Sequence, residues 1–403
     1  MSLQILSVNN PEQMFRYISE IGCDPAGCRI MSSKGISCVV KIKAVDCWQA
    51  NILKQEMLSL NGDVAVARGA ITGKLKKTDC IVIGNLSQIN NLVEKLKRQP
   101  ASLNKIAAQI KETVENSQRD SFTLKAGRFN LELGKRTLIM GIVNVTPDSF
   151  SKDGLLKNGD DLSCAIPYVE KLIRDGADIL DIGGESTRPG ARKVPVKDEI
   201  KRVVPLIKKL SKKTKIPISI DTYKPEVARA ALDAGAVMVN DILGLEPKDP
   251  MLKVLKRFPR VPVVVMHIQG LPRTMQENPV YKDLMNEILC SLQNSIDAGL
   301  QAGIARERFI IDPGIGFGKT LEHNLEIIHR LPELKTLGRP ILIGTSRKSF
   351  IGKILRKKEN GRVFGSAASV VCAIANGAKI VRVHDVGPMK EVVKLADAIL
   401  LKS

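Results

Sequence analysis

The sequence predicts an α/β protein in which a (β/α)8 barrel follows a small N-terminal α+β domain. From residue 137 to residue 385, a short β-branched run, a loop and an amphipathic helical stretch occur eight times in succession. The apolar runs are continuous rather than alternating, which is typical of strands covered on both faces. Eight such units in about 265 residues fit a closed TIM barrel. An open, doubly wound sheet is the alternative fold.

The predicted barrel strands begin about 20 to 47 residues apart, which leaves room for a crossover helix after each one. The barrel domain is therefore assigned to residues 121–403. The eight strands are predicted at residues 137–145, 177–183, 216–221, 237–242, 261–267, 308–314, 339–346 and 379–385.

Residues 1–120 are predicted to form the separate α+β domain. A linking helix is expected at 101–120, and a loop or short strand at 61–73. Nothing in this domain indicates a function, so its role stays open. The remaining predicted elements are helices 11–22, 46–60 and 87–100 and strands 36–45 and 79–84.

The composition is that of a globular protein, with 44% hydrophobic and 26% charged residues. No apolar run reaches the roughly 18 residues of a membrane span, and no secretory leader opens the chain. We therefore expect a cytoplasmic protein with no membrane partner. Cytoplasmic cysteines are usually reduced. Cys23, Cys28, Cys38 and Cys47 lack the paired spacing of a zinc site, so buried thiols are expected there.

The net charge of +20 raises the possibility of a nucleic-acid partner. The basic residues are spread along the chain, however, and only 3% of the residues are aromatic, which leaves few platforms for stacking bases. We expect no nucleic-acid partner. Attraction of small anionic substrates is the favoured use of the charge.

Polar residues cluster where the predicted strands end. In a TIM barrel these carboxyl ends converge on the face that carries the active site. Capping of the following helices explains some Asp and Asn residues, but a helix N-terminus disfavours cations such as Lys348 and Arg382. The clustered residues are Asn144, Asp181, Asp221, Asn240, Asp241, His267, Asp312, Ser346, Arg347, Lys348, Arg382 and His384.

Two kinds of chemistry meet in this cluster. Carboxylates such as Asp221 and Asp312 accept hydrogen bonds in pairs and suit a ligand with adjacent N–H donors. Arg382, His384 and helix N-termini suit a phosphate or diphosphate. The stretch "DPGIGFGKT" is not interpreted as a Walker loop, because Pro313 stands where that loop needs glycine. The cluster predicts a substrate that joins a guanidine-like heterocycle to a diphosphate.

These residues lie in segments that closely resemble dihydropteroate synthases. The resemblance covers about residues 121–403 in the family's order, and 121–134 is similar to the β-hairpin with which such barrels begin. The segments are "MGIVNVTPDSFS" (140–151), "DIGGESTRPGA" (181–191), "SIDTYKPEVA" (219–228), "VNDI" (239–242), "VMHIQGLPRTMQ" (265–276), "DPGIGFGKT" (312–320), "GTSRKSFIG" (344–352) and "RVHD" (382–385).

The resemblance implies a transferase of folate biosynthesis. It condenses 6-hydroxymethyl-7,8-dihydropterin diphosphate with para-aminobenzoate and releases pyrophosphate. The implied catalytic residues are Asp148, Lys348, Arg382 and His384. The implied pterin contacts are Asp221, Asn240, Met266, Asp312, Phe317, Lys348 and Arg382.

The resemblance also implies sites for the other reactants. The diphosphate is expected at Asn144, Arg382 and His384, with Mg²⁺ bound at Asn144 and completed by diphosphate and water oxygens. Pyrophosphate can leave before the amine attacks, because an electron-rich dihydropterin stabilises the cationic methylene. The residues implied for the aminobenzoate pocket and its loops are Phe150, Thr187, Arg188, Pro189 and Ser349.

Some positions depart from the family pattern. After "SFS" the family usually continues with Asp-Gly-Gly, whereas this chain has Lys152-Asp153-Gly154. Ile315 stands where the family often has a phenylalanine, and neither change touches an implied pterin contact. His323 and His329 are expected to be structural or exposed. The glycines of "DPGIGFGKT" are expected to let the chain pass close to a flat ligand, whereas Lys319 has no assigned role.

Three alternative functions remain open at this point. The acceptor can be a ribosylated, phosphorylated aminobenzene instead of para-aminobenzoate. A pterin-binding methyltransferase would use a related barrel, although it has no need of Arg382 and His384. A catalytically silent pterin-binding protein is the third alternative. For the favoured function, the expected partners are small-molecule substrates and a second copy of the chain, as a homodimer.

Overall fold

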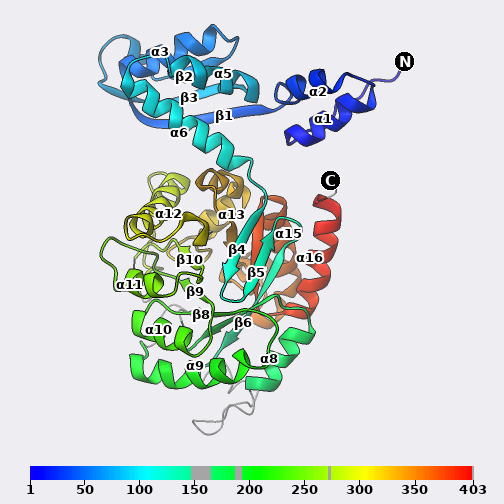
Figure 1. Cartoon of the computed structure of the whole chain (residues 1–403), viewed down its shortest axis with the longest axis vertical. Helices are drawn as coiled ribbons and strands as arrows, with labels where there is room; N and C mark the ends of the chain where they lie inside the picture. The colour runs from blue at the N-terminus through cyan, green and yellow to red at the C-terminus, as the bar shows by residue number, and fades with distance from the viewer. Residues whose placement is uncertain (147–164, 187–192, 271–273, 402–403) are drawn as a thin grey trace. The chain divides into compact units, whose positions relative to one another are not determined.

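The computed structural model describes residues 1–146, 165–186, 193–270 and 274–401. The chain folds into two compact units, Met1–Gln118 and a second unit that begins at Arg119. Figure 1 colours the first unit from blue to cyan and the second from cyan to red. Each unit has its own apolar core.

The N-terminal unit is an α+β fold built on a three-stranded antiparallel sheet of order β1-β3-β2. Residues of β3 alternate between exposed and buried, so helices cover one face of the sheet. Its elements are α1 (Pro11–Glu20), α2 (Pro25–Ser32), β1 (Ser37–Asp46), α3 (Cys47–Leu58), β2 (Asp63–Val66), α4 (Arg68–Ile71), β3 (Lys77–Asn85), α5 (Leu86–Leu96) and α6 (Ala101–Ser117).

Two features of this unit differ from the prediction. Helix α2 was not predicted, although Asp24 caps its first turn and Pro25 opens it, which are ordinary helix-start signals. Helix α6 is more than a link, because Leu103 and Ile110 are buried in the core of this unit. The helix therefore contributes to the stability of the N-terminal unit.

The cysteines of the N-terminal unit are free thiols. Cys28 and Cys47 are buried, and Cys23 and Cys38 are half-buried. Across the described parts of the chain, no group of three or more His, Cys, Asp or Glu side chains is arranged to hold a metal ion.

The second unit is the predicted (β/α)8 barrel. Its eight parallel strands close in the order β10-β11-β12-β13-β6-β7-β8-β9, and each predicted strand overlaps one of them. The strands are β6 (Leu138–Asn144), β7 (Ile179–Gly183), β8 (Ile218–Asp221), β9 (Met238–Asp241), β10 (Val263–Met266), β11 (Phe309–Asp312), β12 (Ile341–Ile343) and β13 (Ala378–Val383).

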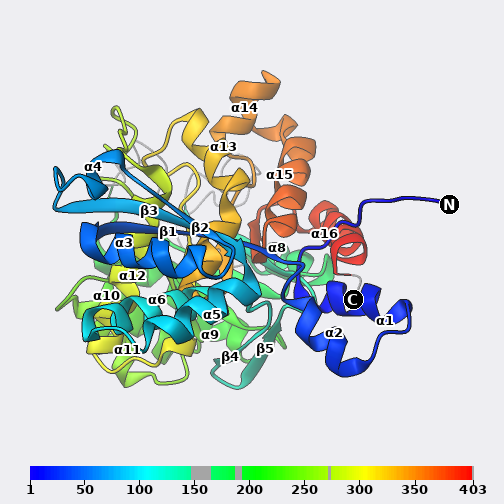
Figure 2. The same cartoon turned by 90° about the horizontal axis from the view of Figure 1, so that it is seen from above.

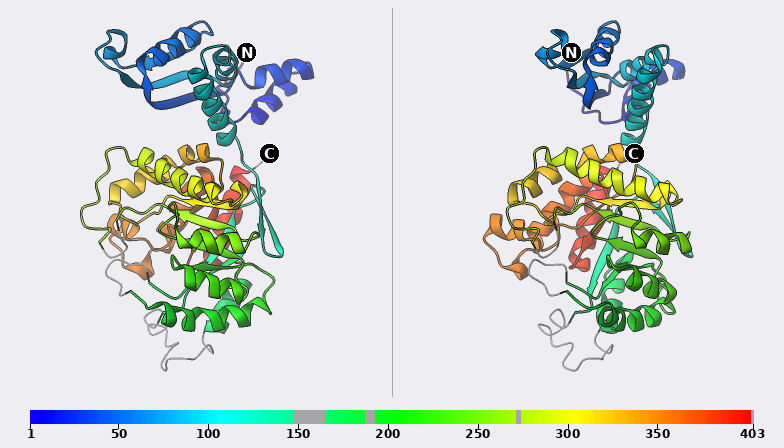
Figure 3. Two further views of the ribbon diagram at one scale, coloured as in Figure 1. Left: turned by 60° about the vertical axis from the view of Figure 1, so that its left-hand side comes forward. Right: turned by 90° about the vertical axis from the view of Figure 1, so that its left-hand side faces the viewer.

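Helices surround these strands (Figures 1 and 3). Figure 2 shows α13, α14, α15 and α16 along one side of the barrel. Within the described residues, no helix is both long and apolar enough to cross a membrane. The helices are α8 (Ala165–Arg174), α9 (Val196–Ser211), α10 (Pro225–Asp233), α11 (Pro250–Arg257), α12 (Leu284–Gln301), α13 (Leu321–His329), α14 (Ser349–Leu355), α15 (Val363–Ala375) and α16 (Val386–Leu400), with the short 3-10 helices η1 (Arg306–Arg308), η2 (Leu331–Leu337) and η3 (Glu359–Gly361).

A β-hairpin precedes the barrel, as the resemblance implied. It pairs β4 (Phe122–Ala126) with β5 (Phe129–Leu133) in antiparallel register. Leu124 and Leu133 of the hairpin share one apolar cluster with the barrel interior, including Met140 near the start of β6. The hairpin therefore packs against the amino end of the barrel, and the carboxyl ends of the strands are left for the site.

Candidate active site

The polar residues predicted at the strand ends lie on one face of the barrel. The parallel register pairs Asn144 with Gly183, Asp221 with Asn240, and Met266 with Asp312. These pairs place the ends of six neighbouring strands at the same level. Arg382 lies in β13, which pairs with β6 and closes the ring.

Arg382 connects two carboxylates from different strands. Its Nε donates to Asp181 Oδ2 at 2.6 Å, and its Nη2 donates to Asp221 Oδ2 at 2.6 Å. Burial alone would lower the pKa of Arg382, but the two carboxylates more than offset this effect and raise it. The guanidinium is therefore a permanent positive charge at the centre of the face.

Asp181 is the residue whose role the sequence did not reveal. Its side chain is fully buried, and its Oδ2 also accepts a hydrogen bond from Asn240 Nδ2 at 3.0 Å. Its other oxygen, Oδ1, is buried and has no hydrogen-bond partner among the described residues. One signal was present, because a carboxylate inside the continuously apolar strand "ADILDIG" requires a buried partner.

Asp221 and Asp312 are carboxyl groups whose ionisation is made difficult by burial. Burial raises the pKa of Asp221 to about 7, with Arg382 lowering it and Asp181 raising it. Burial also raises the pKa of Asp312, against the Gly314 N–H and the charge of Lys348. Each carboxylate is therefore stabilised further by a ligand that donates N–H groups to it.

Asp241, the last residue of β9, accepts a hydrogen bond within its own turn. Its Oδ1 accepts from the backbone N–H of Leu243 at 2.9 Å. Burial, partly offset by this hydrogen bond, raises its pKa to about 8. Asp241 therefore shapes the turn after its strand.

The loop "DPGIGFGKT" packs against the backbone that follows β10. A Cβ atom on Gly314 would lie 2.0 Å from the backbone oxygen of His267, and one on Gly318 would lie 2.5 Å from that of Gln269. Both glycines have positive φ angles. Gly314 and Gly318 thus permit close contact between two loops, and the expected approach of this loop to a flat ligand stays a prediction.

Lys319 is buried beneath this loop. Its Nζ lies 3.0 Å from His267 Nδ1 and donates to the Phe317 carbonyl at 2.9 Å. Burial lowers the pKa of Lys319 to about 7 and, together with the Lys319 charge, lowers that of His267 to about 3. The contacts of Lys319 are therefore with its own loop and with His267 after β10, which is a structural role.

Phe317 gives the site an apolar surface, and Lys348 adds a positive charge beside it. The Lys348 ammonium lies 4.2 Å from the centroid of the Phe317 ring, a cation–π contact. Met266 is buried on the neighbouring strand, and its Cγ lies within 3.3 Å of the position that a Cβ of Gly314 would take. Three of the implied pterin contacts, Lys348, Phe317 and Met266, thus lie around this loop.

His384 and Arg347 follow adjacent strands but have different partners. His384 Nδ1 lies 3.2 Å from Ser346 Oγ, which also accepts from the His384 backbone N–H at 3.2 Å. The Arg347 guanidinium forms a two-point ion pair with Asp385, with Nε donating at 2.9 Å. The Arg347 guanidinium is thus paired with Asp385, whereas the His384 ring is oriented by Ser346 at the end of its strand.

A second buried ion network lies beside the site, and the sequence analysis missed it. Lys224 Nζ donates to the carboxylates of Glu185 and Glu199 and to the Val194 carbonyl at 2.6 Å. Tyr223 Oη also donates to Glu185 at 3.0 Å. Because Glu185 and Val194 lie on either side of residues 187–192, Lys224 connects the two ends of that segment.

The remaining predicted residues fall into two groups. Ser349 is exposed at the first position of α14. Of the two histidines expected to be structural or exposed, His323 completes a capping box with Thr320, and His329 is exposed. The predicted residues outside the described parts of the chain are Asp148, Phe150, Thr187, Arg188 and Pro189.

The fold and the site together define an enzyme of the (β/α)8 class whose active face combines buried carboxylates with fixed cations. Its sequence matches the pterin binding enzyme family over residues 140–384. The dihydropteroate synthase of Synechocystis is 48% identical over 277 residues, a match that covers 68% of this chain and 94% of that protein.

Two further relatives extend the comparison. A probable bifunctional folylpolyglutamate synthase/dihydropteroate synthase of Halobacterium salinarum is 39% identical over 375 residues, covering 93% of this chain and 44% of that protein. The structure of Xanthomonas albilineans dihydropteroate synthase with 4-aminobenzoic acid is similar with a TM-score of 0.64 and 42% identity, covering 69% of this chain and 98% of that one. The chain belongs to the dihydropteroate synthase family, whose members are transferases of folate biosynthesis.

Proposed function

We propose that this chain condenses 6-hydroxymethyl-7,8-dihydropterin diphosphate with para-aminobenzoate, releasing pyrophosphate. The pterin would bind to Asp221, Asn240, Asp312 and Lys348, with Met266 and Phe317 lining its slot. The observation that carries this proposal is the set of buried carboxyl groups at the ends of β7, β8 and β11, which needs N–H donors for full stabilisation.

Arg382 would exchange partners when the pterin binds. In the structure its guanidinium donates to Asp221, the acceptor that the proposal assigns to the guanidine-like edge of the pterin. Both groups are planar and offer adjacent N–H donors, so one can replace the other. The released arm of Arg382 could then contact the ring face and the diphosphate, while Nε stays on Asp181.

Departure of pyrophosphate builds negative charge near the ends of β13 and β6. Arg382 and His384 would stabilise this charge as fixed donors that need little reorganisation. The aromatic amine needs positioning more than activation, since its nitrogen attacks an electrophilic methylene. We expect Ser349 to help form its pocket, together with the implied loop residues.

The proposed Mg²⁺ would be held at Asn144. The donor set fits such an ion, because Asn144 offers a neutral carboxamide oxygen at a strand end and Mg²⁺ retains several water or phosphate ligands. When bound, the ion would neutralise part of the diphosphate charge. Arg382 and His384 would still orient the leaving group from the neighbouring strand.

A turnover assay tests the reaction and the acceptor. The pure protein is incubated with the pterin diphosphate, Mg²⁺ and either para-aminobenzoate or its ribosylated, phosphorylated analogue, and both pterin product and pyrophosphate are measured. We expect product with para-aminobenzoate, the amine named in the related Xanthomonas structure. Product with the ribosylated amine alone would overturn the choice of acceptor, and pyrophosphate without an amine product would leave only a half-reaction.

We also propose a cytoplasmic homodimer. Exposed apolar residues occur at helical spacing on adjacent helices, with Phe364 and Val371 on α15 and Leu395 and Ile399 on α16. Such a patch is typical of a subunit interface. Sedimentation equilibrium should give twice the chain mass, and a monomer at micromolar concentration would contradict the proposal.

The N-terminal unit has a counterpart in the archaeal relative. The Halobacterium match covers 93% of this chain, so it must include most of residues 1–120. We propose that this unit accompanies the barrel as a conserved part of one group of synthases, outside the catalytic face. Deletion of residues 1–118 should therefore leave the pterin affinity of a folded barrel unchanged.

A further inference from the structure

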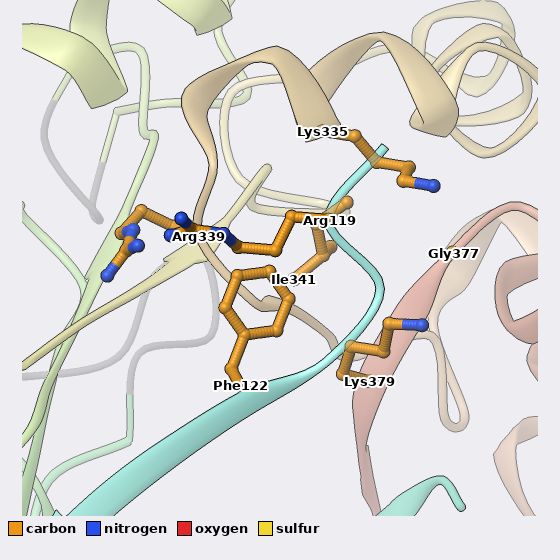
Figure 4. A pocket seen from close by; sticks show the side chains of 7 residues that line it. All are labelled: Arg119, Phe122, Lys335, Arg339, Ile341, Gly377 and Lys379. Atoms are coloured by element: carbon orange, nitrogen blue, oxygen red, sulfur yellow. The ribbon is translucent and has the colours of Figure 1, made fainter. Parts of the chain in front are cut away.

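Four cationic side chains surround a small recess at the amino end of the barrel, opposite the candidate active site. They are Arg119, Lys335, Arg339 and Lys379, and the recess is completed by Phe122, Ile341 and Gly377. Ile341 begins β12 and Lys379 is the second residue of β13, which fixes the position of the recess. Figure 4 shows the guanidinium groups of Arg119 and Arg339 on one side of the Phe122 ring, and the ammonium groups of Lys335 and Lys379 on the other.

Two of these cations are buried. Arg339 is 5% exposed and Lys379 is 8% exposed. Burial, together with Arg306 and Arg119, lowers the pKa of Arg339 to about 10. Burial also lowers the pKa of Lys379, although Asp120 opposes this effect. The folded protein therefore keeps like charges together in a place where water screens them poorly.

Partners within the described residues offset only part of this charge. Asp120 lies 2.8 Å from Lys335 and 3.5 Å from Lys379, so one carboxylate serves two ammonium groups. Arg339 donates to the backbone carbonyls of Gly338 and Arg306, which supply dipoles but no negative charge. One carboxylate thus contacts two of the four cations, while Glu307 and Asp397 act on Arg339 and Lys379 only through weaker, longer-range attraction.

The shape and chemistry of the recess limit the ligand. The enclosed space among the side chains has room for about one water-sized sphere, so a phosphate would be bound by the side chains at its opening and not inside it. Guanidinium groups bind phosphate oxygens with two donors, and ammonium groups add point charge. Gly377 suits this packing, because its φ is +98° and a Cβ there would lie 3.3 Å from Lys335 Cδ.

We infer that this recess is a second anion site that binds one tetrahedral oxyanion of the phosphate class at its mouth. It lies on the face opposite Asn144 and His384 and is separate from the proposed diphosphate position. The bound anion would neutralise the surplus charge at the amino ends of β12 and β13 and thereby stabilise the barrel.

Two substitutions that change the local charge in opposite directions test the site. Inorganic phosphate is titrated by calorimetry into the full chain at constant ionic strength. Lys335→Ala should weaken phosphate binding at the recess about two- to fivefold, the range of one exposed ion pair. Asp120→Asn should strengthen it, because the competing carboxylate is removed. Lys390→Ala on α16 removes a half-buried lysine elsewhere and should leave the titration unchanged.

Phosphate that binds at the candidate active site contributes equally to the titrations of the unsubstituted chain and of the variants. Differences between the titrations therefore report the recess. Phosphate should also raise the melting temperature of the unsubstituted chain more than that of Lys335→Ala. A second titration with glycerol phosphate distinguishes free phosphate from a phosphoryl group carried by a larger molecule. Binding equal to that of phosphate indicates the phosphoryl group. Loss of binding indicates the free anion. Identical titrations for the unsubstituted chain, Lys335→Ala and Asp120→Asn would overturn the inference.

Discussion

At the carboxyl end of the barrel one half-buried guanidinium is held between two carboxylates, whereas at the amino end only two of four clustered cations contact a carboxylate, and they share it. Arg382 contacts both Asp181 and Asp221 at 2.6 Å. Lys335 and Lys379 both rely on Asp120. The first arrangement is nearly neutral and can exchange an internal donor for a substrate, while the second is deficient in negative charge and gains stability from any anion that fits.

The largest effect is expected from Arg382→Ala, which removes the positive charge between two carboxylates at the carboxyl end of the barrel. Asp181 and Asp221 would lose their shared counter-charge, and an unpaired buried charge costs about 3–5 kcal/mol of stability. Loss of the charge-stabilising donor should also lower kcat/KM by about 10²–10³. Chemical denaturation and steady-state kinetics measure the two effects.

Two controls separate charge balance from catalysis. Adding Asp181→Asn to Arg382→Ala should restore part of the stability but none of the activity. Arg330→Ala removes an arginine paired on the surface of the barrel and should cost well under 1 kcal/mol. Equal losses for Arg330→Ala and Arg382→Ala would remove the distinction between the two environments.

The next effect concerns Asp312, a carboxylate that forms no ion pair with an arginine among the described residues. Asp312→Asn replaces one acceptor oxygen by a donor, so one pterin N–H would face another N–H group. A lost charge-assisted hydrogen bond costs about 1.5–3 kcal/mol, which corresponds to a drop in pterin affinity of roughly 10- to 150-fold. Unchanged affinity by calorimetry would remove Asp312 from the site.

The barrel and the strand ends that carry the described polar residues could be predicted from the sequence, because continuous apolar runs and polar strand ends are local patterns. The pairing of Arg382 with Asp181 could not, since these residues are 201 positions apart and only closure of β13 onto β6 brings their strands together. The contact of Gly314 with the His267 backbone was not predicted from "DPGIGFGKT". Sequence alone does not say which surface a loop packs against.

A smaller effect is expected from pH. Burial raises the pKa of Asp221 to about 7 from an ordinary value of 3.8. The folded protein thus binds the proton more tightly than the unfolded chain, and this contribution to stability is present below pH 3.8 and is lost as the pH rises to about 7. Pterin binding has the opposite dependence, because the ligand donates to the ionised carboxylate.

Pterin affinity should therefore rise between pH 6 and pH 8, with a midpoint at about 7. Calorimetry in buffers with different ionisation heats would show the release of a proton on binding near pH 6. In Asp221→Asn the proton release and the rise of affinity with pH should both become smaller, because only Asp312 then contributes to them. A profile that is the same in both proteins would assign the pH dependence to another group.

The smallest effect on ligand binding is expected from Lys319→Met, even though Lys319 occupies the place of the phosphate-binding lysine in a Walker-like stretch. Its ammonium is buried against His267 Nδ1 and the Phe317 carbonyl, and burial lowers its pKa to about 7. Methionine fills the same space but leaves the carbonyl without its donor, at a cost of about 1–3 kcal/mol of stability. The affinity for pyrophosphate should stay within about twofold of the unsubstituted chain, while Arg382→Ala weakens it strongly. A large loss in Lys319→Met alone would move the diphosphate from β6 and β13 to the loop after β11, and the carboxyl end would then hold two separate cationic sites instead of one balanced cluster.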